Sequence, residues 1–195
     1  MSSGNPDLLT AALEGLALNW SIIPVGEDKK AAVKWWQYQA KRPDGDQLTT
    51  WFSTGRYGGL AVVCGPVSGG LVVRDFDDAN AYKKWAVSFP KLAEMLPTRR
   101  TARGYHVFFR NGLEKIIHLA DGSGELRAAG YCLLPPSVHP NGTAYLWIVK
   151  PNGQVPLIVD IEAAGLAEMS QRSREAEEVE KSRKWRSREF ENLKQ

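Results

Sequence analysis

The chain has 195 residues, of which 43% are hydrophobic and 24% are charged, and its formal net charge is +3. This composition is typical of a globular protein and excludes a collagen-like, wholly disordered or disulfide-scaffold chain. The small net charge means that a polyanionic partner would have to bind a local basic patch. No apolar run in the sequence is long enough to span a bilayer, and the N-terminus lacks the pattern of a secretory signal peptide, so we expect a cytoplasmic protein.

The first half of the chain predicts a mixture of helices and strands. Pro6 is well placed to begin a helix, and the apolar residues after it recur at intervals of three and four. The elements expected next are a strand over 20–25, a helix that begins at the N-cap residue Asp46, and strands over 59–64 and 71–77.

The second half of the chain is richer in strands. A helix is expected over 79–89, with a break at Pro90. The strands expected after it cover 98–101, 105–110, 124–127, 131–134 and 144–149. Together these elements predict an α+β domain over residues 1–165.

Residues 166–195 are expected to form a separate charged tail. From Glu168 onward the chain has eight Lys or Arg and seven Asp or Glu residues, with no Gly or Pro. Opposite charges spaced four residues apart favour a long solvated helix. Such a helix is either simply a solvated terminus or a linker that docks a partner.

Cys64 and Cys132 are the only cysteines, and each lies within an apolar run. The chain contains no C-x-x-C motif. We therefore expect two buried thiols that pack as small hydrophobic groups, and neither a disulfide nor a zinc site.

The segment GGLVVRDFDDAN contains the first candidate site. Because side chains alternate along a strand, Asp75 and Asp77 should share one face while Phe76 turns into the core. Two adjacent carboxylates repel each other unless a cation lies between them, and hard divalent ions such as Mg²⁺ or Mn²⁺ prefer such oxygen ligands. The alternative is that these acidic residues cap the following helix, which is our interpretation of Asp78.

A second candidate is the segment TARGYHVFF. His106 begins an apolar strand there, close in sequence to Arg99, Arg100 and Arg103. It is either a structural histidine or a donor of a ring N–H to a phosphate oxygen, as the guanidinium groups would be. Gly104 would allow a ligand to approach the backbone closely.

The third candidate lies between residues 124 and 147. Glu125 and Arg127 point to one face of a short strand, where they form either a surface ion pair or part of a binding site. Ser137 and His139 follow in a proline-rich exit from the next strand. They are either turn-forming residues or residues that face a ligand.

These segments, in the order GLVVRDFD, TARGYHVFF and GELRAAGY followed by PPSVHPNGTAYLW, resemble the bifunctional DNA primase/polymerase N-terminal domain (prim-pol) of the archaeo-eukaryotic primase superfamily. The resemblance covers about residues 8–160. It implies an RRM-like mixed or antiparallel catalytic sheet with an N-terminal α/β unit. It also implies that Asp75, Asp77 and Glu125 bind two divalent ions, Mg²⁺ or Mn²⁺, and that His106 belongs to the catalytic site. The residues that it brings near the incoming nucleotide are His106, Arg127, Ser137, His139 and either Lys29 or Lys30.

The activity that the resemblance implies is template-directed nucleotidyl transfer. Such an enzyme would synthesise or extend primers on single-stranded DNA from nucleoside triphosphates, in the replication of a plasmid, a phage or another mobile element. The chain has no G-x-x-x-x-G-K-[ST] motif for an ATP-driven motor of its own. The resemblance also implies a helicase domain or protein as a further partner. Two other hypotheses use the same residues: a metal-dependent nuclease, and a non-catalytic RRM-like module that binds nucleic acid.

A template strand would also need a surface of its own. Arg99, Arg100 and Arg103 are predicted to contact DNA beside the site. Nearer the N-terminus, basic residues alternate with Trp35 and Trp36. These two rings either belong to the core or stack on the bases of a single strand.

Overall fold

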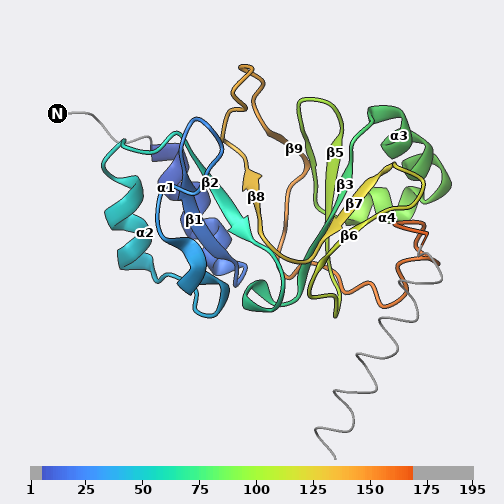
Figure 1. The fold of residues 1–195 in the computed structure, drawn as a ribbon, viewed down its shortest axis with the longest axis horizontal. Helices are drawn as coiled ribbons and strands as arrows, with labels where there is room; N and C mark the ends of the chain where they lie inside the picture. Colours follow the sequence, from blue (N-terminus) through green and yellow to red (C-terminus); the bar gives the residue numbers. More distant parts are fainter. Residues whose placement is uncertain (1–5, 169–195) are drawn as a thin grey trace, which may run out of the picture.

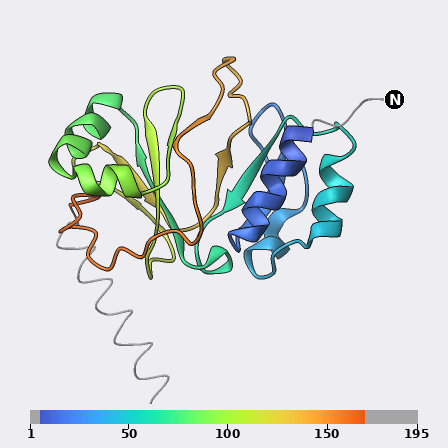
Figure 2. The ribbon, with the colours of Figure 1, turned by 180° about the vertical axis from the view of Figure 1, so that it is seen from behind.

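The computed structural model describes residues 6–168, which form two antiparallel sheets (Figure 1). The smaller sheet has the strand order β1-β2-β8, with β1 over Ser21–Val25, β2 over Gly59–Val63 and β8 over Tyr131–Leu134. Helices α1 (Pro6–Ala17) and α2 (Gly45–Phe52) cover one of its faces, as the view from behind shows (Figure 2). Two short 3₁₀ helices, η1 (Trp35–Gln39) and η2 (Pro66–Ser68), belong to the same half of the molecule.

The larger sheet has the strand order β6-β7-β3-β5-β4-β9. Its strands are β3 (Leu71–Phe76), β4 (Thr98–Arg100), β5 (Tyr105–Arg110), β6 (Ile116–His118), β7 (Gly124–Arg127) and β9 (Leu146–Val149). Helices α3 (Ala79–Ser88) and α4 (Pro90–Met95) lie at the end of the molecule opposite to α1 and α2 (Figure 1). These antiparallel sheets with few helices confirm the predicted α+β class.

The strand β3 is buried on both faces, which explains why its first half is continuously apolar. Leu71 and Val73 pack into a core that also contains side chains of α1, α2 and the smaller sheet. Val72 and Phe76 point the opposite way, into a core with α3. Asp75 therefore shares the face of Leu71 and Val73, the face that is turned toward the smaller sheet.

Most predicted elements are present, with boundaries shifted by a few residues. The prediction of Asp46 as the cap of the second helix is wrong. Asp44 is the N-cap, because its carboxylate accepts a hydrogen bond from the Gln47 backbone N–H at 2.8 Å. Asp78 does cap α3, through a hydrogen bond from Ala81 N–H at 3.2 Å. Strand β6 was not predicted, since three residues of which two are exposed carry no clear pattern.

The two cysteines are buried and free, as predicted. Their sulfur atoms lie 3.9 Å apart, and the Cys64 thiol donates to Cys132 Sγ. This hydrogen bond, together with burial, raises the pKa of Cys64. Both thiols contribute to the core between the sheets.

The described chain remains packed to its end. Leu166 and Ala167 are buried, and the Leu166 carbonyl oxygen accepts a hydrogen bond from Arg74 Nε at 2.7 Å. The predicted charged helix lies outside the described residues, apart from its first residues. Among residues 6–168, every helix is too short or too polar to cross a membrane.

Gly104 serves strand packing in this structure. It precedes β5 at the point where Tyr105 pairs with Phe76, and a Cβ atom on Gly104 would collide with the Phe76 carbonyl oxygen. The close approach that was expected between Gly104 and a ligand is therefore an approach between two strands.

We expect Gly104→Ala to lower the free energy of unfolding by about 1–3 kcal/mol, because the collision forces β3 and β5 apart. Urea denaturation followed by circular dichroism measures this loss. Gly112→Ala is the matched control, since a Cβ there meets open space. Equal stability of the two variants would contradict the role of Gly104.

Candidate active site

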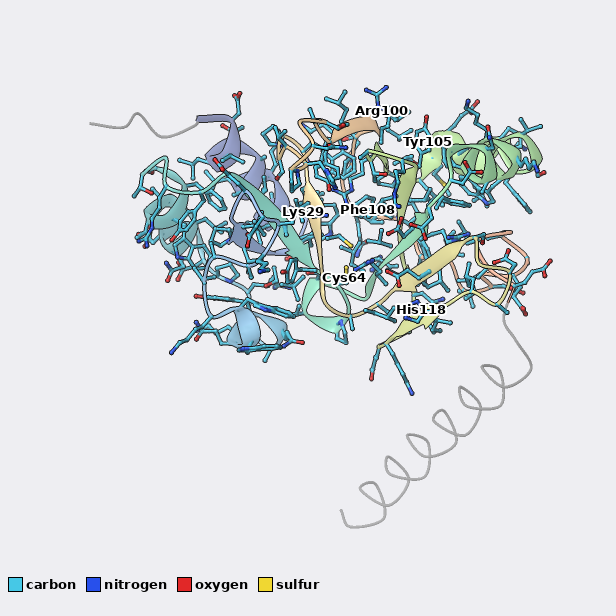
Figure 3. The ribbon with its side chains drawn as sticks, turned by 45° about the horizontal axis from the view of Figure 1, so that its top comes forward. Lys29, Cys64, Arg100, Tyr105, Phe108 and His118 are labelled. Atoms are coloured by element: carbon cyan, nitrogen blue, oxygen red, sulfur yellow. The ribbon has the colours of Figure 1, made fainter. Side chains whose placement is uncertain are left out.

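A row of side chains crosses one face of the larger sheet. Strand pairing aligns one residue from each strand, in the order His118, Glu125, Asp75, His106, Arg99 and Trp147. Side chains at directly paired positions project from the same face of a sheet. Two acidic residues are thus flanked on both sides by groups that donate hydrogen bonds (Figure 3, in which His118 is labelled).

Asp75 is held on one side by His106 and Arg99. His106 Nε2 lies 3.0 Å from Asp75 Oδ1, and Arg99 Nη2 lies 2.7 Å from His106 Nδ1. A guanidinium group can only donate, so His106 Nδ1 must be the acceptor. The ring proton is consequently on Nε2, where it is donated to Asp75.

On its other side, Asp75 is linked to Glu125 through Arg127. Arg127 Nη2 lies 2.5 Å from Glu125 Oε1, and Arg127 Nε lies 3.6 Å from Asp75 Oδ2. The second oxygen of Glu125 is 3.0 Å from His118 Nδ1. Arg127 therefore lies between the two carboxylates that strand pairing places side by side and offsets part of their negative charge.

The charges around Asp75 change its acidity. Burial on its own would raise the pKa of Asp75, but the hydrogen bond from His106 and the positive charges of Arg127 and Arg99 outweigh it. The pKa of Asp75 consequently lies below its ordinary value. The row thus keeps an ionised carboxylate in a largely buried position.

A pocket of about 470 Å³ opens over this row. The pocket is lined by Asp75, Asp77, His106 and Arg127. Its other lining residues include Lys29, Arg99, Arg103, Tyr131, Cys132, His139 and Tyr145. Arg103 Nη2 is 3.7 Å from Asp77 Oδ1. The pocket therefore contains both acidic and positively charged side chains. This combination suits an anionic ligand that binds together with cations.

Lys29 and His139 meet on the pocket wall although they are 110 residues apart. Lys29 Nζ lies 3.2 Å from His139 Nε2. An ammonium group only donates, so His139 accepts from Lys29 at Nε2, and His139 Nδ1 lies 2.8 Å from Asn141 Oδ1. Figure 3 labels Lys29 on the N-terminal half of the molecule and Phe108 on the other half.

The structure brings together most of the residues that sequence analysis selected. Asp75, Asp77, His106, Arg127 and His139 line the pocket. Glu125 is buried beside them, joined to the row by the ion pair with Arg127.

The structure differs from the prediction for Ser137 and Lys30. The Ser137 hydroxyl is fully buried and accepts from the Leu60 N–H at 2.9 Å while it donates to the Leu60 carbonyl at 3.1 Å. It ties β2 to the loop after β8 and does not face the pocket. Lys30 is exposed and lies 3.6 Å from Asp28, so Lys29 is the basic residue at the pocket.

The three arginines predicted to contact DNA lie in three different environments. Arg99 is only 2% exposed, which removes it from any DNA-contacting surface. Arg100 is exposed on the opposite face of β4, because neighbouring residues of a strand alternate. Arg103 is exposed at the pocket beside Asp77.

Sequence analysis did not predict that the Arg99 side chain is buried beneath the pocket, or that Tyr145 packs against it. The Arg99 guanidinium lies 4.4 Å from the centre of the Tyr145 ring, and its Nε and Nη1 atoms have no hydrogen-bond partner among the described residues. The alternation of β4 could have revealed the opposite directions of Arg99 and Arg100. Nothing in the sequence indicates that Tyr145 reaches Arg99.

An antiparallel sheet with this acidic and cationic pocket is consistent with a primase-type fold. Residues 12–169 match the family described as bifunctional DNA primase/polymerase, N-terminal, named Prim-Pol. Because the match covers most of the chain, the chain belongs to the Prim-Pol family, as the resemblance of its motifs predicted. A search of curated proteins found no match. The family supports a primase/polymerase function of the nucleotidyltransferase type, which acts on DNA and nucleotides and generally uses divalent metals.

We expect Arg99→Met to leave His106 Nδ1 free to take up a proton, because the guanidinium group that donates to Nδ1 is removed. In the wild type, ¹⁵N NMR of the imidazole should show a protonated Nε2 and an unprotonated Nδ1. In the variant, Nε2 should keep its proton, because the Asp75 carboxylate still accepts from it, and Nδ1 should become protonated in part of the molecules. With three histidines in the chain, His118 and His139 serve as internal controls. An unchanged His106 signal in Arg99→Met would contradict the assignment.

Asp75 should stabilise the fold in a pH-dependent way. Because its folded pKa is depressed, its contribution is complete at neutral pH and is lost as the pH falls through the folded pKa, below about 4. The difference in unfolding free energy between the wild type and Asp75→Asn should therefore shrink in acid. Urea denaturation at neutral and acidic pH measures it, with the exposed Asp46→Asn as control. A difference in unfolding free energy that grows in acid would contradict a depressed pKa of Asp75 in the folded state.

Proposed function

We propose that the chain is a DNA primase/polymerase that synthesises or extends primers on single-stranded DNA in the replication of a mobile element such as a plasmid or phage. One observation carries the proposal. In a Prim-Pol domain, strand pairing sets Asp75 beside Glu125, and Asp77 lies at the pocket over them. Acidic residues grouped in a cationic pocket suit a reaction at the phosphates of a nucleotide.

The acidic residues fit the divalent ions that this chemistry uses. Asp75, Asp77 and Glu125 offer carboxylate oxygens, the ligands that Mg²⁺ and Mn²⁺ prefer. Within residues 6–168, His, Cys, Asp and Glu side chains do not form a ready-made group of three or more that could hold a metal ion. Arg127 now forms an ion pair with Glu125, His118 lies 3.0 Å from the other Glu125 oxygen, and Arg103 lies beside Asp77.

We infer that these three carboxylates would hold two divalent ions. When bound, such ions lower the pKa of an attacking hydroxyl and neutralise the charge of a triphosphate and its leaving group. The remaining work of the protein would be to bind and orient the substrates, which is the main contribution of enzymes that transfer nucleotides.

The cationic side chains of the pocket would bind the triphosphate. Arg127 offers a planar fork of donors that matches phosphate oxygens, and Lys29 and Arg103 add positive charge from other sides. His139 lies beside Lys29 and would direct its ammonium group. Binding of a triphosphate by Arg127 would release the oxygens of Asp75 and Glu125 for cations, so the substrate and the ions would bind together.

His106 would orient Asp75. Its Nε2 proton is donated to Asp75 and its Nδ1 accepts from Arg99, so both ring nitrogens are already engaged. A histidine held at both nitrogens is unsuited to act as a general base. Its role in the proposed reaction is therefore to keep the first carboxylate in place.

We expect Asp75→Ala/Asp77→Ala to lower primer synthesis and extension at least about a hundredfold, the loss typical when charge-stabilising groups are removed from a catalytic site. The assay uses a single-stranded template, nucleoside triphosphates and Mg²⁺ or Mn²⁺. Circular dichroism checks that the variant is folded. Asp46→Asn, which changes an exposed aspartate on α2, should retain full activity.

The same assay separates the other two hypotheses. Degradation of labelled DNA without nucleoside triphosphates would favour a nuclease. Binding of oligonucleotides without synthesis or metal-dependent nucleotide binding would favour a non-catalytic module. Undiminished synthesis by the double variant would remove Asp75 and Asp77 from the proposed site.

A further inference from the structure

An exposed aromatic stack leads away from the pocket. Trp36 is 68% exposed, and its ring stacks on Trp35 with 4.7 Å between centroids and 28° between planes. Trp35 in turn contacts Tyr131 edge-on at 5.1 Å, and Tyr131 lines the pocket. We call Trp36, Trp35 and Tyr131 the Trp36 stack. It runs from the pocket wall to an indole face in solvent.

The stack rests on a firmly anchored part of the chain. Trp35 and Trp36 begin η1, whose Tyr38 carbonyl oxygen accepts a hydrogen bond from Ser21 Oγ at 2.7 Å. The Tyr38 ring packs edge-on against Trp51 of α2 at 5.2 Å. The Tyr131 hydroxyl accepts from the Ala31 N–H at 3.1 Å. The exposed indole is therefore held in place, which reduces the entropy lost when it binds a partner.

The chain around the stack is positively charged. Residues 29–43 contain no Asp or Glu, and their basic residues are Lys29, Lys30, Lys34, Lys41 and Arg42. Lysine side chains along an aromatic surface match the phosphates of a strand whose bases stack on the rings. None of the other exposed large apolar side chains among residues 6–168 belongs to this segment, so an apolar protein partner has little surface to bury here.

We propose that the Trp36 stack binds a base of the single-stranded template outside the pocket, while Lys30 and Lys34 contact its phosphates. This inference rests on the proposed function, because it concerns the strand that such an enzyme would copy. The template is favoured over an incoming nucleotide because Trp36 is separated from the pocket wall by the whole ring of Trp35. A nucleotide bound by its phosphates at Arg127 would sit inside the pocket, whereas a strand can extend beyond it.

The test compares two labelled oligomers with the full chain by fluorescence anisotropy. One is an oligothymidylate, and the other is an abasic oligomer with the same number of phosphates. The wild type should bind the oligothymidylate more tightly than the abasic oligomer. Trp36→Ala should lose about fivefold to a hundredfold in affinity for the oligothymidylate, the effect of one lost base stack, and should bind the abasic oligomer as the wild type does.

Two further variants sharpen the result. Trp36→Phe keeps an aromatic face and should retain most of the preference for bases. Lys34→Ala removes a charge beside the stack, so it should weaken both oligomers alike and reduce the salt dependence of binding. Because Trp36 is exposed, the variants should remain folded, and circular dichroism verifies this.

Equal binding of oligothymidylate by the wild type and Trp36→Ala would overturn the proposal. It would also fail if Trp36→Ala weakened nucleoside triphosphate binding and left oligomer binding unchanged. Asp75→Ala/Asp77→Ala separates this inference from the proposed function. That variant should keep the preference for the oligothymidylate over the abasic oligomer. If the wild type showed this preference but no primer synthesis, only the proposed catalysis would be refuted.

Discussion

The antiparallel pairing of β3 with β5 and β7 is the constraint on which the site depends. It places Asp75 between His106 and Glu125, residues that are 31 and 50 positions further along the chain. A shift of one residue in either pairing would send the neighbouring side chain to the other face of the sheet. The apolar residues of β3 prevent such a shift, because Val72 and Val73 belong to different cores. Packing of the strand thus determines the geometry of its polar end.

Charge balance is the second requirement of this arrangement. Two carboxylates at paired positions would repel each other strongly in a largely buried setting. Arg127 lies between them, and His106 and His118 lie within hydrogen-bond distance of the carboxylates at either side. Arg99 sits deeper against the Tyr145 ring, and its Nε and Nη1 atoms have no hydrogen-bond partner within residues 6–168. The ion pairs within the site thus offset the charge of its two paired carboxylates.

Local patterns predicted much of the fold and part of the candidate site. The alternation along 71–77 located the strand and gave the direction of Asp75, and the Asp78 cap followed from residue type. Long-range pairing could not be read in this way. Ser137 is kept out of the pocket by a hydrogen bond to Leu60, 77 residues away. Lys29, and not Lys30, is the basic residue at the pocket because it contacts His139. The exposure of Trp36 likewise depends on how η1 packs.

The path of β8 ties the two halves of the molecule into one folding unit. β8 follows β7 of the larger sheet in the chain, yet it pairs with β2 of the smaller one. A fragment that ended before residue 130 would leave the backbone groups of β2 without a neighbour along one edge, a template for aggregation. The N-terminal α/β unit is therefore no detachable module. Evolutionary exchange or engineered transfer of either half would require both to move together.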